Sequence, residues 1–210
     1  MSNMQITNPT AAWIQKTLAP VEKAGNTINT AMATGMTQAM GGSDTYQANS
    51  LPATPNKVHL YQLFDDPMRP PNPLDYKIAN RLGWVGINDS AEFLKAADTP
   101  FKRKMISYLA GGLFLNRQDR QYVDYQITAW AGQSDLMRAG ADLGTARLLQ
   151  VSGAGDVALL SRYRNPVDKG VFYAAMSANA IQYGYWMPSF SVVSQMIDRA
   201  ANTPPVIRWY

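Results

Sequence analysis

The run of residues that most invites a chemical reading is glycine-rich, Gly153 to Ala158, with the letters GAGDVA. It matches the G-x-G-x-x-A pattern of dinucleotide-binding turns, in which glycines let the backbone approach a pyrophosphate. The surrounding chain opposes that interpretation, because the residues before it continue a helical pattern and the Asp156 carboxylate would repel a phosphate. We therefore predict a glycine turn between two helices and expect no cofactor.

Carboxylates are the next candidates, since helical glycan-cleaving enzymes place two of them around one glycosidic bond. The chain has only two glutamates, Glu22 and Glu92. Glu92 could pair with Asp89 or Asp98, but it follows Asp89 by three residues, the spacing of a helix capping box. We predict that Glu92 is a cap residue, and a cell-wall glycan-degrading enzyme that uses Glu92 is kept as an alternative.

The sequence contains few of the residues that nucleophilic catalysis or metal binding needs. There is no cysteine, His59 is the single histidine and no G-x-S-x-G motif occurs. A serine hydrolase would depend on His59, which lies in a proline-rich stretch. Neither zinc-ligand nor calcium-loop spacing is present. We predict no catalytic residue and no metal site, and hence a protein that is not an enzyme.

Basic residues form one cluster that could hold an anion: Lys102, Arg103, Lys104, Arg117 and Arg120. Nucleic-acid binders usually carry a denser basic stripe. Here the net charge is only +4, with four basic against five acidic residues in 1–75 and fifteen against ten in 76–210. Weak binding to nucleic acid or to an anionic membrane is a second alternative, and a solvated helix surface is our main interpretation.

The elements that must position these residues are helices. Caps recur from residue 76 onward, for example Thr99 before Pro100 and Asn165 before Pro166. The sequence predicts an all-α fold, a compact domain over 76–210 with about six or seven helices. We place them near 89–97, 100–115, 117–131, 134–151, 156–163, 167–184 and 188–201.

Residues 1–75 read as an extended N-terminal arm. One amphipathic helix is expected within residues 10–40, with an apolar stripe made by Ile28, Met32, Met36 and Met40 among small residues. Residues 41–75 form a proline-rich tether, interrupted by an apolar patch at 58–64 that could be a strand or a docking segment. The arm either packs on its own domain or reaches a neighbour.

Targeting signals are not apparent. The first residues lack the basic and apolar regions of a signal peptide, and no run of about 18 apolar residues indicates a membrane span. We expect a location in the cytoplasm or within a particle, and peripheral membrane contact stays open. Residues 170–197 carry no charge, which fits either two core helices or a partner-facing surface.

The combined pattern predicts a structural subunit of a larger protein assembly, in homo- or hetero-oligomeric contact with other subunits. Phage particles and bacterial secretion or conjugation machines are analogies for such an assembly. The docking elements would be the stripe at 28–40 and the C-terminal residues Trp209 and Tyr210, since Trp and Tyr are enriched at binding hot spots. The alternative is that both chain ends fold back on their own domain.

Overall fold

The computed structural model describes residues 56–66, 69, 72–112 and 115–209. All of the regular structure in this part of the chain is helical, which confirms the all-α prediction. The elements are α2 (Leu60–Phe64), α3 (Pro73–Trp84), α4 (Ser90–Ala96), α5 (Pro100–Gly111), α6 (Arg117–Arg138), α7 (Leu143–Val151), α8 (Val157–Leu160), a 3-10 turn (Ser161–Tyr163), α9 (Pro166–Tyr183) and α10 (Phe190–Asn202). The predicted arm helix, with Ile28, Met32, Met36 and Met40, lies outside the described residues, as does Tyr210.

Side-chain caps start most of these helices, as the sequence predicted. The Asp89 carboxylate accepts hydrogen bonds from the backbone N–H groups of Ala91 and Glu92, both at 2.8 Å. Thr99, Asn116 and Asn165 cap α5, α6 and α9 in the same way. Each of these bonds satisfies a backbone donor that has no partner inside its helix.

Helix α6 differs most from its predicted form. The sequence suggested two helices, 117–131 and 134–151, separated near Gly132. In the structure α6 continues to Arg138, and the break falls at Gly140, whose φ of 97° ends the helical path. Asp142 then caps α7 by accepting from the Thr145 N–H at 2.9 Å. Gly132 is therefore a packing position within one long helix.

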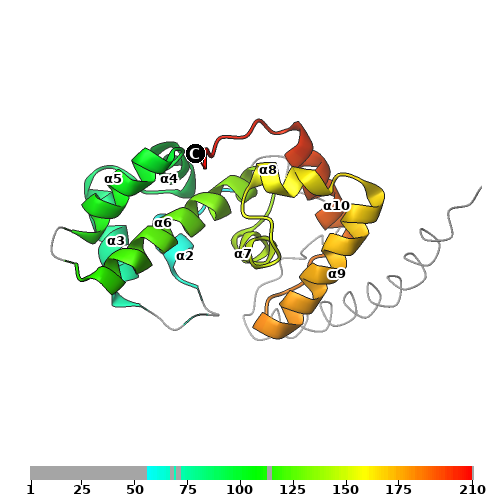
Figure 1. The fold of residues 1–210 in the computed structure, drawn as a ribbon, viewed down its shortest axis with the longest axis horizontal. Coiled ribbons are helices and arrows are strands. Elements are labelled where there is room, and N and C mark those ends of the chain that lie inside the picture. The colour runs from blue at the N-terminus through cyan, green and yellow to red at the C-terminus, as the bar shows by residue number, and fades with distance from the viewer. Residues whose placement is uncertain (1–55, 67–68, 70–71, 113–114, 210) are drawn as a thin grey trace, which may run out of the picture.

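This long helix joins two hydrophobic clusters, as Figure 1 shows from its central place in the ribbon. The N-terminal cluster combines α2, α3, α4 and α5 with the first half of α6, through residues such as Leu63, Phe93 and Ile127. The C-terminal cluster combines the end of α6 with α7, α8, α9 and α10, through residues such as Leu148 and Phe172. Val58 packs against both clusters.

The chain is already folded at residue 60, whereas the sequence placed the start of the domain near residue 76. Leu60, Leu63 and Phe64 are at most 4% exposed in the N-terminal cluster. They form the short helix α2, which His59 caps by accepting from the Tyr61 N–H at 3.4 Å, so the apolar patch is not a strand. The flanking prolines favoured an extended tether in the sequence analysis. A five-residue helix is stable only through tertiary packing, which local sequence patterns do not show.

The end of the chain also returns to the body of the protein. Figure 1 shows the segment after α10 crossing the molecule to reach α4. Ile207 is buried in the N-terminal cluster, and the Arg208 N–H donates to the Asp98 carbonyl at 2.8 Å.

Among the described residues, no helix is long and apolar enough to cross a membrane.

Candidate protein-interaction surface

Most residues of the predicted basic cluster contact groups of their own chain. Lys102 lies 2.9 Å from the Asp98 carboxylate, and Lys104 lies 2.5 Å from that of Asp124. Arg103 is 6% exposed and donates to the carbonyl oxygens of Ala97 at 3.0 Å and Arg208 at 2.7 Å. Burial lowers the pKa of Arg103 from its ordinary value, against the opposing charge of Asp98.

Of the two arginines in α6, one has partners within the chain and the other is exposed. Arg120 donates to the carbonyl oxygens of Ser107 and Gly112, and its guanidinium lies 4.4 Å from the centre of the Tyr108 ring. Arg117 is exposed at the start of α6. Four of the five proposed anion-binding residues therefore contact acidic side chains or carbonyl oxygens of the chain itself.

The outward side of α5 presents a different feature, a row of large apolar side chains. Phe101, Met105 and Leu109 follow one another at intervals of four residues and are 74%, 55% and 51% exposed. Tyr108 lies beside them, and we call these four residues the α5 outer face. Residues four apart share one side of a helix, so the buried Ile106 and Ala110 line the opposite side. The row is left without a partner in the described chain.

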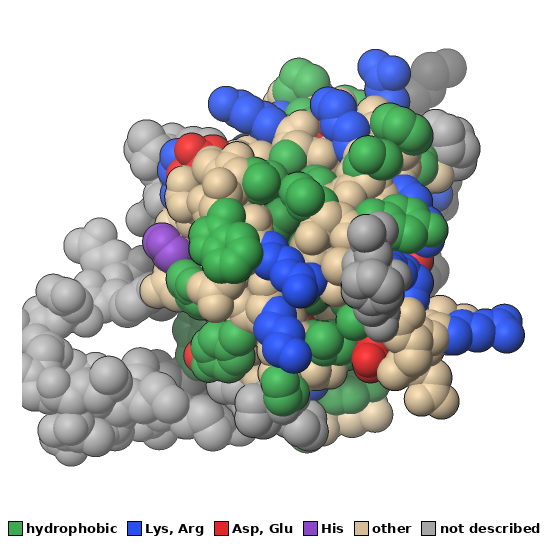
Figure 2. Space-filling model, turned by 90° about the vertical axis from the view of Figure 1, so that its left-hand side faces the viewer, with side chains coloured by type: hydrophobic (Ala, Val, Ile, Leu, Met, Phe, Trp, Pro, Cys, Tyr) green, Lys and Arg blue, Asp and Glu red, His purple; other side chains and the backbone are tan. Residues whose placement is uncertain are grey.

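Further exposed aromatic residues lie on the neighbouring helices. Trp84, at the end of α3, is 84% exposed, and Tyr125 of α6 is 69% exposed. Helix α3 is tied to α5 by Arg81, which donates to the Ala110 carbonyl at 2.9 Å. Figure 2 shows this end of the molecule, where apolar and basic side chains alternate and acidic ones are few.

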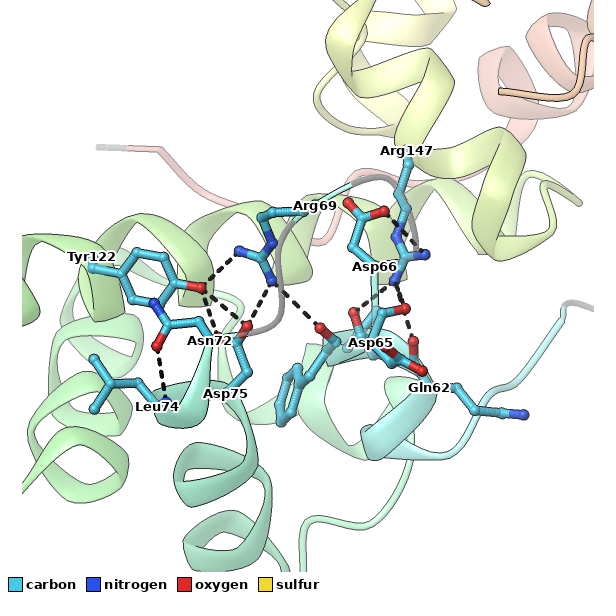
Figure 3. A network of polar contacts seen from close by, with 11 residues as sticks. Gln62, Asp65, Asp66, Arg69, Asn72, Leu74, Asp75, Tyr122 and Arg147 are labelled. Carbon is cyan, nitrogen blue, oxygen red and sulfur yellow. Dashed lines mark hydrogen bonds and ion pairs between the residues drawn. The ribbon is translucent and has the colours of Figure 1, made fainter. Parts of the chain in front are cut away.

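A polar network joins the loop before α3 to α6, as Figure 3 shows. The Arg69 guanidinium lies 2.7 Å from the Asp75 carboxylate and donates to the Tyr122 hydroxyl at 2.8 Å. The Tyr122 hydroxyl in turn donates to Asp75 at 2.9 Å. Burial raises the pKa of Asp75, against the effect of Arg69. Burial and the neighbouring Asp75 raise the pKa of Tyr122 to about 12.

Beside this network is a small hollow between α2 and α3. It is lined by Tyr61, Phe64, Asp65, Asp66, Arg69, Asn72, Asp75, Tyr76 and Ala79. Its volume of about 20 Å³ holds one or two water molecules, far less than a sugar ring needs. The carboxylate of Asp75 is held by Arg69, and that of Asp66 faces Arg147 at 3.7 Å. These contacts give the network a structural part, because they connect Arg69 to α3 and α6 and Asp66 to α7.

Glu92 is not among the residues around the hollow. Its carboxylate accepts from the Asn88 N–H at 2.7 Å, just before α4. Asp89 is the N-cap of α4, and Glu92 bonds to the residue before it, in place of the Asp89 N–H that a capping box would use. The glycine-rich run is likewise a turn between α7 and α8, with Gly153 at φ 99°. Asp156 caps α8 by accepting from the Leu159 N–H at 2.7 Å, so its carboxylate serves the fold.

Trp209, proposed as a docking residue, contacts its own chain. Its indole N–H donates to the Asp156 carboxylate, and the Arg103 guanidinium lies 4.9 Å from the centre of its ring. These contacts connect the chain end to α5 and to the N-cap of α8. Trp209 therefore folds back on its own domain, which was the alternative to docking on a partner in the sequence analysis. Asp156 was recognisable as a helix cap, but its bond to residue 209 depends on tertiary contact alone.

Comparison with protein-family models, curated proteins and solved structures found no match for this chain. The interpretation of its surfaces therefore rests on the residues themselves. Of the features described above, the row of Phe101, Met105 and Leu109 is the longest series of exposed apolar side chains on one side of a helix.

The Tyr122 hydroxyl offers a test of the polar network through pH. A folded-state pKa of about 12, above the ordinary 10, means that the folded protein retains the proton longer than the unfolded chain. The stability that Tyr122 contributes is therefore complete below pH 10 and is lost as the pH rises toward 12. We expect the difference in unfolding free energy between wild type and Tyr122→Phe to shrink over that range. Urea denaturation at pH 8, 10 and 11 measures it, and a constant difference would contradict the role given to this hydroxyl.

Proposed function

We propose that this chain is an interaction subunit of a larger protein assembly and that the α5 outer face is its docking surface. The observation that supports this most directly is the row of Phe101, Met105 and Leu109, exposed on a helix whose other side is buried. Single exposed apolar residues are ordinary, but contiguous ones commonly mark contact sites. An amphipathic helix that lies in a partner's groove binds through apolar anchors on one of its sides.

The energies involved are sufficient for a specific contact. Fully burying one such side chain contributes about 1.5–3 kcal/mol, so three contribute several kcal/mol before the costs of association. The flanking Lys102 and Lys104 are paired with Asp98 and Asp124, which limits the charge that docking must desolvate. A partner with an apolar groove fits this surface best. Phage particles and bacterial secretion or conjugation machines remain the kinds of assembly that the sequence suggested.

The two alternatives are supported less well. An enzyme that uses Glu92 would need that carboxyl in a cleft, and here it accepts from the Asn88 N–H just before α4. A binder of nucleic acid or anionic membrane would use the basic cluster, of which four members are engaged by the chain itself. Salt-sensitive binding of the full chain to DNA or to anionic vesicles, in place of a protein partner, would favour that alternative.

The double substitution Met105→Lys with Leu109→Lys tests the proposal. In extracts of the cells that make the protein, we expect the tagged wild-type chain to elute with a complex well above its own 23.2 kDa. The double variant should elute at its own mass, with an unchanged melting temperature. The control, Val151→Lys with Gln195→Lys, adds the same charge at exposed sites elsewhere and should elute with the complex. A wild-type chain that elutes alone, or a double variant that stays in the complex, would refute the proposal.

A further inference from the structure

Helix α9 has a second unpartnered apolar face, far along the chain from α5. Val171 is 60% exposed and Ile181 is 86% exposed. Val167 and the exposed Ala174 and Ala178 complete a row. Successive members are four, three, four and three residues apart, the spacing of a seam that packs on another helix. We call these five residues the α9 seam.

The opposite side of α9 is already used by the fold. Phe172, Tyr173, Met176 and Ala180 are buried in the C-terminal cluster. Helix α9 lies along one edge of the described fold (Figure 1), with α10 and α7 packed on its inner side. The α9 seam therefore faces away from the core.

The distribution of charge along the sequence indicates which segment could pack on the α9 seam. Residues 170–197 contain no charged side chain, and the second longest uncharged run of the sequence is 24–43, between Lys23 and Asp44. That second run contains the predicted stripe of Ile28, Met32, Met36 and Met40. Packing one uncharged surface on another leaves no charge to be desolvated. Methionine side chains also adapt to the uneven depth of a seam that alternates alanine with larger residues.

We propose that residues 28–40 form a helix that packs on the α9 seam of the same chain. The stripe from Ile28 to Met40 would be about 18 Å long, and the seam from Val167 to Ile181 is about 21 Å long, at 1.5 Å per helical residue. Ala31, Ala33, Gly35 and Ala39 lie among the stripe residues. Side chains this small let two helices approach closely, and the alanines of α9 do the same from the other side.

The connection between the two segments favours the chain's own arm over a second copy. The Asn56 amide donates to the Ala141 carbonyl at 2.9 Å, and Ala141 belongs to the same cluster as the inner side of α9. The fifteen residues 41–55 can span about 50 Å at full extension. Such a tether raises the effective concentration to the millimolar range. A free partner would instead have to bind through five side chains, far short of the roughly 800 Å² per partner of a stable interface.

A cysteine-labelling experiment tests this proposal in the full chain, which has no native cysteine. Ile181→Cys places one thiol in the seam, and its rate of reaction with a soluble disulfide reagent reports whether the seam is covered. We expect this thiol to react about tenfold more slowly than in the triple variant Ile181→Cys, Met32→Asp and Met36→Asp, because covering by a tethered helix restricts access to transient opening. The rate should not depend on protein concentration.

Leu109→Cys, on the α5 outer face, is the matched control. Its thiol should react at the same rate with or without the two aspartates. Equal rates at residue 181 with and without them would overturn the proposal. Protection that grows with protein concentration would also overturn it, since the occupant would then be the arm of another copy. The outcome is independent of the proposed function, because complex formation through α5 is measured separately.

Discussion

Replacement of Gly132 by alanine is expected to lower the unfolding free energy by about 3 kcal/mol or more, since overpacking against backbone has no inexpensive relief. A Cβ atom at this position would overlap the backbone carbonyl oxygen of Gly155 in the turn between α7 and α8. It would also lie 3.2 Å from the amide nitrogen of Gln150, which donates to the Ala129 carbonyl at 3.1 Å. Helix α6 would have to move away from the turn, and the C-terminal cluster would open.

Gly83 provides the matched control for this substitution. It lies in the last turn of α3, and the nearest atom to a Cβ there would be the Asn88 side-chain oxygen at 3.9 Å. Gly83→Ala should be neutral or stabilising by up to about 1 kcal/mol, from helix propensity alone. Chemical denaturation followed by circular dichroism measures both variants. A Gly132→Ala protein as stable as wild type would show that α6 and the turn are not in this close contact.

Removal of the Arg147 side chain should have an effect of similar size. Arg147 is 5% exposed and donates to the carbonyl oxygens of Gln62, Leu63 and Asp65 at 3.2, 3.2 and 2.8 Å. Burial lowers its pKa from the ordinary value, against the raising effect of Asp66. Arg147→Ala leaves three carbonyl acceptors and one carboxylate without this donor. We expect a loss of about 3–5 kcal/mol, the usual result of removing one partner of a buried charged contact.

The position of these contacts predicts where the protein would loosen first. Arg147 joins α7 to the end of α2, so residues 56–66 should become accessible to protease in Arg147→Ala before the rest of the described chain. Limited proteolysis with mass spectrometry detects that order. Arg162→Ala, at an exposed site, should leave both stability and cleavage pattern unchanged. Cleavage of Arg147→Ala at the same sites and rates as wild type would show that this arginine does not anchor α2.

The sequence by itself determined the features that depend on neighbouring residues. Caps at Asp89, Thr99, Asn116 and Asn165 were recognisable because a cap bonds to a backbone N–H only two or three residues away. The all-helical class followed from these caps and from the spacing of apolar residues. The glycine-rich run was interpreted as a turn for a similar local reason: the residues before it continue a helical pattern.

Tertiary structure alone decided which side chains meet across the fold. Helix α2 is too short to form without the N-terminal cluster and Arg147, so its sequence suggested only a patch in a tether. The predicted break between residues 131 and 134 is absent, because Gly132 lies within α6 and packs against the backbone of Gly155. The basic residues around Arg103 were interpreted as a solvated helix surface or an anion site, and the sequence did not show that their partners include Asp124 of α6 and the end of the chain. Such contacts depend on the three-dimensional path of the backbone, which residue type and local spacing do not encode.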